Sequence, residues 1–191
     1  MSNARNLSKL IPNSSGLIAN ANIDSSAAIA QSKLAAIASS NLPTGSIIQV
    51  QSTTTNTAVS NTDTASNLDL MSVNITPNFS SSKILILLSA MFGAFNPNGA
   101  LQLLRDSTNL ATAANTFGSG TGFIAFDDFV AASNQYALAE LSFHHLDTPS
   151  TTSQITYKLK GNSNYAMYFN ITSNGSSGFA SSSITAMEIK G

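Results

Sequence analysis

The order of apolar and polar residues divides the chain near Pro43. Before that residue the chain is rich in Ala, Ser, Asn and Ile and holds no aromatic residue, and every Phe and Tyr follows it. A segment without aromatic side chains rarely builds a core of its own, because these side chains supply much of the apolar area that a core buries. We therefore predict an N-terminal anchoring arm over residues 1–43 and one globular domain over residues 44–191.

A helix is expected in the second half of the arm, from Asp24 to Ala38, with Asp24 or Ser25 as its N-terminal cap. Apolar residues recur there in one narrow helical seam, formed by Ala27, Ala30, Leu34 and Ile37, with Ile29 beside it. The seam predicts either a helix packed on its own domain, or a helix that bundles with sister chains or docks on another protein of an assembly. The preceding stretch has no steady period and is expected to be extended anchoring chain, with Ile18 and Ile23 among its apolar residues.

After Pro43 the pattern changes to short strands separated by turn residues. Met71, Val73 and Ile75 alternate with polar residues, which is typical of a half-buried strand. The segment Lys83–Phe92 is almost continuously apolar, as expected for a central strand that is buried on both faces. Asn78–Ser82 is predicted to form the turn between these two strands.

The remaining strands are expected at residues 46–51, 101–105, 138–146, 153–160, 165–171 and 183–189. The strands at 138–146 and 153–160 are predicted to pair with each other across a turn at Asp147, Thr148 and Pro149. This number of short strands favours a mainly β protein, a jelly-roll-like antiparallel β-sandwich with helix confined to the arm.

The low content of charge changes the picture of the surface. Charged residues make up 9% of the chain, against about 25% in an average soluble protein, and the formal net charge is -1. Little charge repulsion therefore opposes self-association, and together with the helical seam this predicts a homotrimer. The scarcity of Lys and Arg disfavours nucleic-acid binding. The longest apolar run, Ile84–Phe95, is too short to span a bilayer, so we expect no membrane insertion.

The residues that could carry chemistry do not form a catalytic set. The chain has no cysteine, which excludes disulfides and thiolate sites. His144 and His145 are neighbours on a predicted strand and face opposite sides, so one subunit cannot use both on one metal ion. Three copies of one of them could still meet at a three-fold axis. Neither Gly118–Gly122 nor the neighbouring pair Asp127 and Asp128 fits a known catalytic motif. We expect no catalytic, cofactor-binding or metal-binding residue, and hence no enzyme and no cofactor.

Two parts of the sequence resemble segments of known proteins. The run Gly16–Ile23, followed by Ala27–Leu34, resembles the N-terminal arms of tail-fibre-like and other appendage proteins of phages, especially phages of marine bacteria and cyanobacteria. The runs Leu146–Ser153, Ile155–Lys158 and Ser182–Ile189 are similar to a β-domain that is widespread in phage structural proteins. The resemblance implies a homotrimeric protein of the virion, assembled in the cytoplasm of a bacterial host, and it brings no catalytic residue.

Two functions agree with these expectations. One is a tail fibre or tail spike module that binds other virion proteins through residues 1–43 and contacts a glycan or protein on the host surface. The alternative is a trimeric capsid decoration (cement) protein that stabilises the head. In both cases the arm is expected to face the virion and the turns of the β-domain to face outward. The candidate partner-contact residues in these turns are Asn98, Asp106, Asn109 and Asp147.

Overall fold

The computed structural model describes most of the β-domain and the end of the arm, namely residues 37–61, 65–93, 99–110, 124–126, 136–163, 167–175 and 179–191. The chain forms two compact units, Met1–Asn41 and Leu42–Gly191. The described part of the first unit contains one short 3₁₀ helix, Ser39–Asn41. Ile37 and Ala38, which were expected at the end of the arm helix, are not helical, and Ile37 is exposed. The other expected anchoring residues lie outside the described part of the chain: Ile18, Ile23, Ala27, Ile29, Ala30 and Leu34.

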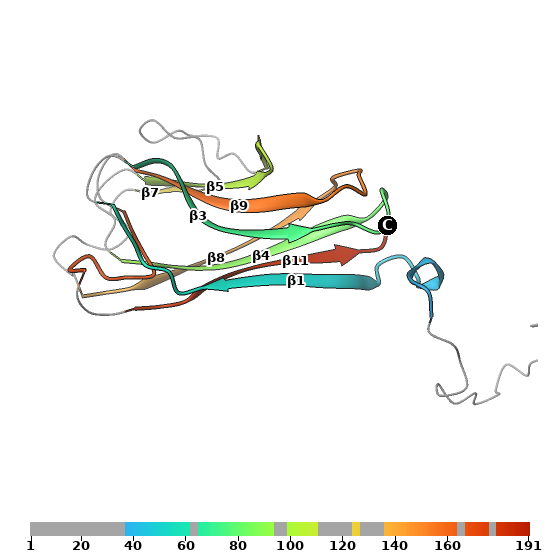
Figure 1. Ribbon diagram of the computed structural model, residues 1–191, viewed down its shortest axis with the longest axis horizontal. Coiled ribbons are helices and arrows are strands. Elements are labelled where there is room, and N and C mark those ends of the chain that lie inside the picture. The colour runs from blue at the N-terminus through green and yellow to red at the C-terminus, as the bar shows by residue number, and fades with distance from the viewer. Residues whose placement is uncertain are drawn as a thin grey trace, which may run out of the picture. The chain divides into compact units, whose positions relative to one another are not determined.

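The second unit consists of two antiparallel β-sheets that pack face to face (Figure 1). Sheet A contains, in spatial order, β1 (Ile47–Thr55), β11 (Ser182–Ile189), β4 (Lys83–Phe92) and β8 (Ala139–Asp147). Two short strands extend this sheet, because β10 (Met167–Phe169) pairs with the end of β4 and β2 (Val59–Asn61) pairs with β10. The prediction of a mainly β, two-sheet sandwich is therefore confirmed at this level.

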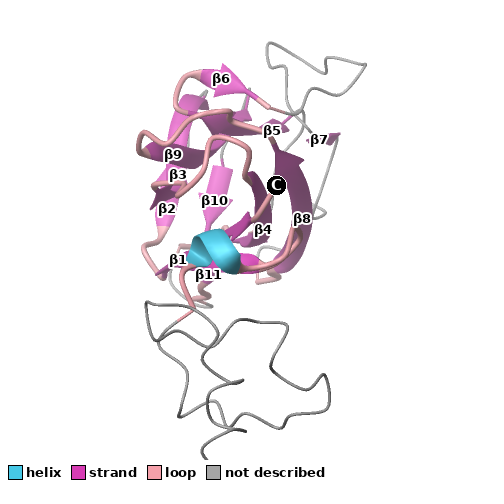
Figure 2. Ribbon diagram, turned by 90° about the vertical axis from the view of Figure 1, so that its right-hand side faces the viewer, coloured by secondary structure: helices cyan, strands magenta, loops and turns pink. Residues whose placement is uncertain are grey.

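Sheet B contains β3 (Ala65–Ile75), β9 (Ile155–Ser163) and β5 (Gly99–Arg105), and β5 also pairs with β6 (Thr108–Asn109) and β7 (Ile124–Phe126). In the view along the strands, sheet B lies above sheet A (Figure 2). Successive strands change sheet repeatedly: β3 belongs to sheet B, β4 to sheet A, β5 to sheet B, β8 to sheet A and β9 to sheet B.

The core forms where the inward sides of the strands meet. In β3 and β9 the predicted alternation is confirmed, because Met71, Val73 and Ile75 are buried, as are Ile155, Tyr157 and Leu159, while the residues between them are not. Sheet A contributes the inward side of β4 and the side chains of β10 and β11. Phe92 and Phe169 meet in this core with their ring centroids 5.4 Å apart. Burial of these apolar side chains is the main favourable term in folding.

Strand β4 is central in its sheet but is buried on one face only, so the expectation of burial on both faces is wrong. Ile84, Ile86 and Leu88 are almost fully buried, whereas Leu87, between them, is 39% exposed. The cause is the architecture: sheet B covers one face of sheet A, and no described segment covers the other. The apolar residues of β4 therefore continue onto an outer surface.

The predicted pairing of 138–146 with 153–160 is also wrong. Strand β8 pairs with β4 in sheet A, and β9 pairs with β3 and β5 in sheet B. Residues 148–154 therefore connect the two sheets and do not form a hairpin turn. The sequence pattern did not separate these cases, because a short polar segment with a proline suits both connections.

The strand register defines the two ends of the sandwich. At the end that we call proximal, β1 begins at Ile47, β4 begins at Lys83, and β8 and β11 end at Asp147 and Ile189. The opposite, distal end carries the end of β4 and the start of β8 (Figure 1). The chain enters the sandwich at the proximal end through a type II turn, in which Gly45 has a φ of 88° and the Ser46 amide donates to the Pro43 carbonyl.

Candidate functional site

Most of the expected partner-contact residues lie at the proximal end, where the chain enters β1. Asp147 pairs with Ile84, and Asn109 pairs with Leu104 close to the end of β5. Asn98 is outside the described residues. The described turns therefore lie at the end of the sandwich where β1 begins.

Asp147 is a structural residue of the interior. It is 7% exposed, and both of its carboxylate oxygens accept a hydrogen bond from the Arg105 Nη1, at 2.9 and 3.0 Å. The hydroxyl of Tyr157, a fully buried residue, donates to Asp147 Oδ2 at 2.8 Å. Burial, and then the hydrogen bond and charge of Asp147, raise the pKa of Tyr157 well above its usual value. The cluster joins β8 of sheet A to β5 and β9 of sheet B, and it withdraws Asp147 from contact with a partner.

Asp106 is exposed, but its side chain is also part of the local fold. Its φ of 52° lies in the left-handed region, which Asp adopts more readily than most residues. Its amide donates to the Thr156 carbonyl at 2.8 Å, and its Oδ1 accepts from the Thr156 amide at 3.0 Å. Asn109 is half-buried in β6. Of the expected contact residues, Asp106 alone is both described and exposed.

A second buried carboxylate, Glu188, was not singled out from the sequence. It lies on the inward side of β11, in the same cross-strand row as Ile84 and Asp147, and has no exposed surface. Five donors point at its two oxygens, all within 3.3 Å: Gln49 Nε2, the Asn78 amide, Asn78 Nδ2, the Phe79 amide and Ser82 Oγ. Burial alone would raise the pKa of Glu188, but the hydrogen bonds from Gln49, Ser82 and Asn78 outweigh it and lower the pKa. The signal that could have found this residue is a carboxylate on the inward side of a strand.

Asn170 is a buried polar residue that follows β10 and lies against the gap between β1 and β2. It is fully buried with a φ of 58°, and its Nδ2 donates to the carbonyls of Thr55 and Thr57, between β1 and β2. Its Oδ1 accepts a hydrogen bond of 2.6 Å from Ser182 Oγ. The side-chain amide thus supplies hydrogen bonds that the interrupted ladder does not make.

His144 and His145 face opposite sides of β8, as expected for neighbouring residues of a strand. His144 is exposed on the outer side of β8, and His145 is half-buried on the inner side that it shares with Leu141 and Phe143. Within the described ranges, no group of three or more His, Asp or Glu side chains is placed to hold a metal ion. No helix in the same ranges is both long enough and apolar enough to cross a membrane.

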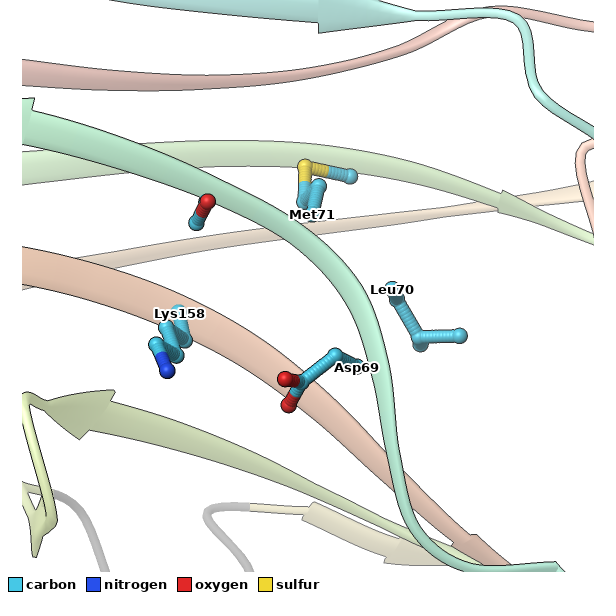
Figure 3. A pocket seen from close by; sticks show the side chains of 5 residues that line it. Asp69, Leu70, Met71 and Lys158 are labelled. Carbon is cyan, nitrogen blue, oxygen red and sulfur yellow. The ribbon is translucent and has the colours of Figure 1, made fainter.

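Sheet B carries a small hollow on its surface, with a volume of about 220 Å³ (Figure 3). It is lined by Asp69, Leu70, Met71, Ser72 and Lys158. Lys160 forms an ion pair of 3.2 Å with Asp69, which is mostly exposed. The lining offers one carboxylate, one ammonium group and one hydroxyl. These groups suit weak polar contact with a ligand, and they do not form a pair of a nucleophile and its general base.

Tyr136 is the exposed aromatic residue that directly precedes β8 at the distal end. It is 68% exposed, and it lies three residues before Ala139, which pairs with Phe92. An aromatic ring with a hydroxyl group can both stack on a flat partner and form a hydrogen bond. Phe179, which is 67% exposed, lies three residues before β11 begins at the same end, so Tyr136 is the exposed aromatic residue there that also carries a hydroxyl group.

No protein-family model matches the chain, and no curated protein matches its sequence.

Proposed function

We propose that this chain is a non-enzymatic structural protein of a bacteriophage particle, a homotrimeric tail fibre or tail spike module. Residues 1–43 anchor it to other virion proteins, and its β-domain contacts a glycan or protein of the host surface. The low charge of the chain and its resemblance to phage appendage proteins support this proposal.

The strand order supports a jelly-roll assignment of the β-domain. In sheet A the order is β1, β11, β4, β8, and in sheet B it is β3, β9, β5, β7. Each sheet therefore takes strands from the first and last parts of the domain next to each other, as in a jelly roll of two Greek keys. This architecture recurs in viral capsid proteins and in lectins, so it suits both a virion protein and a protein that binds a glycan.

The observation that carries the proposal is that the chain entry and the exposed Tyr136 lie at opposite ends of the sandwich. The chain enters at the proximal end, through the turn at Gly45, while the exposed Tyr136 lies at the distal end. A module anchored through its arm then presents the distal end to a partner. Because Asp147 is buried and Asp106 lies beside the chain entry, we place the host contact at the distal end and not at the proximal turns.

One observation favours the decoration protein as a second candidate. The exposed Asp106 lies at the same end as the arm junction, so a proximal surface could contact coat subunits next to the arm. In that case the proximal end is the functional one, and Tyr136 has no role in binding.

The test is to label intact phage particles with antibody fragments raised against the purified protein and to locate them by electron microscopy. Labels on the tail, together with loss of host adsorption in a Tyr136→Ala phage, would support the fibre or spike. A regular lattice of labels on the head, with heat-sensitive heads when the protein is removed, would support the decoration protein. Particles without label would contradict both.

A further inference from the structure

The outer side of sheet A is unusually apolar at its proximal end. One cross-strand row, Val50, Met187, Leu85 and Leu146, runs across all four long strands of the sheet and holds no polar side chain. Val50 and Leu146 are each 50% exposed. The row before it contains Ile47 and Ile189 beside Lys83, and the row after it contains Leu87 between the polar residues Thr185 and His144. We call these seven residues the apolar face: Ile47, Val50, Leu85, Leu87, Leu146, Met187 and Ile189.

The outer side of sheet B, in contrast, carries polar and charged side chains. Its outward rows place Ser72 beside Lys158, and Asp69 beside Lys160 and Gln102. Lys160 and Asp69 form an ion pair, as exposed charges on a sheet commonly do. Two sheets of one domain thus differ in their outer sides, and a contiguous exposed apolar patch on a soluble domain marks an interaction site.

We propose that the apolar face packs against other copies of this chain. This inference rests on the homotrimer of the proposed function and assigns the surface that holds it together. Each copy contributes the same face around the symmetry axis, so Leu85, Leu87 and Leu146 of one copy are buried by its neighbours.

The charge distribution favours a second copy over a partner of another kind. Across the outward rows of sheet A, the formal charges are Lys83 at the proximal margin and Glu140 towards the distal end. Ser89 and Ser142 both donate to Glu140, and these hydrogen bonds lower its pKa. Lys83 lies beside Ile189 at the edge of the face, whereas the row of Val50, Met187, Leu85 and Leu146 contains no charged side chain. The centre of the face therefore does not repel its own copy, and it offers no charged group with which to select a charged partner.

The size of the face also suits a contact between copies. Four strands spaced about 4.8 Å apart, over the five residues of β4 from Lys83 to Leu87 at about 3.4 Å each, cover roughly 300 Å² in plane. This reaches the few hundred Å² at which exposed apolar surface marks an interaction site, and it would form the apolar part of the roughly 800 Å² per partner that a specific interface buries. In addition, the apolar rows lie at the end where the chain enters from the arm, so copies whose arms associate would bring these rows to the same level.

The test uses the full-length chain and measures its mass in solution at micromolar concentration by light scattering. Leu87→Glu combined with Leu146→Glu places two carboxylates in the apolar face at positions that are already partly exposed in one chain. We expect the wild type at three chains of 19.8 kDa and this variant at one chain, with the β-type circular dichroism retained. Leu104→Glu is the matched control, since Leu104 lies beside Lys158 on the outer side of sheet B. It should remain a trimer.

A second measurement keeps the inference falsifiable if the double variant fails to fold. The chain has no cysteine, so Thr185→Cys introduces a single labelling position next to Leu87 on the outer side of sheet A. A spin label there should show coupling between copies, and one at Ser72→Cys on sheet B should not.

The outcomes separate this inference from the function on which it rests. A wild-type monomer would overturn the homotrimer and the inference together. A trimer that persists in the double variant, with no coupling at position 185, would overturn the inference alone. If such trimers also failed to join the particle, the face would belong to another virion protein.

Discussion

Glu188 is a fully buried carboxylate at the proximal end, and such a group is tolerated only when its oxygens accept hydrogen bonds. Its donors come from three separate places: Gln49 on β1, the turn at Asn78 and Phe79, and Ser82 before β4. Glu188→Ala removes the common acceptor of all of them. We expect this single change to loosen the turn between β3 and β4 and the start of β1.

The size of the effect follows from the groups that are left without an acceptor. An unsatisfied buried donor costs about 1–3 kcal/mol. Ser82 is buried and Phe79 is half-buried, whereas Asn78 is at the surface, where water can replace part of its loss. We therefore expect Glu188→Ala to lower the free energy of unfolding by about 3 kcal/mol. For a domain of this size that corresponds to a fall of about 6–12 °C in the unfolding midpoint. Glu188→Gln keeps one oxygen acceptor and should lose about half as much.

The assay is thermal unfolding followed by circular dichroism, with all variants at one protein concentration. Glu140→Ala is the control, because Glu140 also accepts two hydrogen bonds but is exposed on the outer side of sheet A, and its loss should leave the midpoint nearly unchanged. An unchanged midpoint in Glu188→Ala would refute the reasoning, since it would mean that the five hydrogen bonds do not stabilise the fold.

The same residue predicts a dependence on pH with a definite sign. The folded state lowers the pKa of Glu188, so folding favours its ionised form. Its contribution is then complete above the pKa of the unfolded chain, about 4.3, and is lost as the pH falls through the lower pKa of the folded state. The difference in stability between the wild type and Glu188→Gln should therefore shrink in acid. A difference that stays constant down to the acid limit of folding would show that the charge is not what the donors stabilise.

Three further predictions concern the sandwich and its anchor. Asp147→Asn should lower the free energy of unfolding by about 2–3 kcal/mol, because it leaves the half-buried Arg105 without its charge partner; urea unfolding measures this, and an unchanged midpoint would contradict it. Gly93→Ala should cost about 1–3 kcal/mol, because its Cβ would lie 2.4 Å from the Ile171 carbonyl oxygen; thermal unfolding is the measurement, and a wild-type midpoint would show that the backbone yields freely. A chain that begins at Leu42 should keep its β-type circular dichroism spectrum but fail to join the phage particle in a complementation assay, and normal incorporation would show that residues 1–41 are not the anchor.

The period of the apolar residues was enough to locate the long strands and to identify their inward sides. Ile155, Tyr157 and Leu159 lie inward because side chains alternate along a strand, and this depends on the local sequence alone. Pairing between distant strands could not be read in the same way. Strand β8 pairs with β4 and not with its neighbour in sequence, and this pairing joins residues that lie far apart in the chain, so no local pattern announces it.

The apolar strand at residues 83–92 was interpreted from the usual meaning of its pattern. A continuous apolar run normally indicates burial on both faces, and here one of those faces is the outer side of a sheet. If copies of the chain cover that face, the pattern describes the assembled protein correctly and a single chain only in part. The buried polar residues were missed for a different reason, since Glu188 and Asn170 look like ordinary surface residues until their donors and acceptors are placed around them.

The way in which β1 is held bears on how an anchored module resists force. The strand that follows the arm pairs with the last strand of the chain, from Ile47 beside Ile189 to Thr55 beside Ser182. The junction itself is also tied to that last strand, because the Gly45 amide donates to the Lys190 carbonyl at 2.8 Å and the Lys190 amide donates to Ser46 at 2.9 Å. A load along the strands that enters through the arm therefore shears β1 against β11 and acts on the whole ladder at once, whereas a load across the strands would open its hydrogen bonds one after another. Since β11 is held on its other side by β4, such a load is passed into the centre of sheet A and not into its edge.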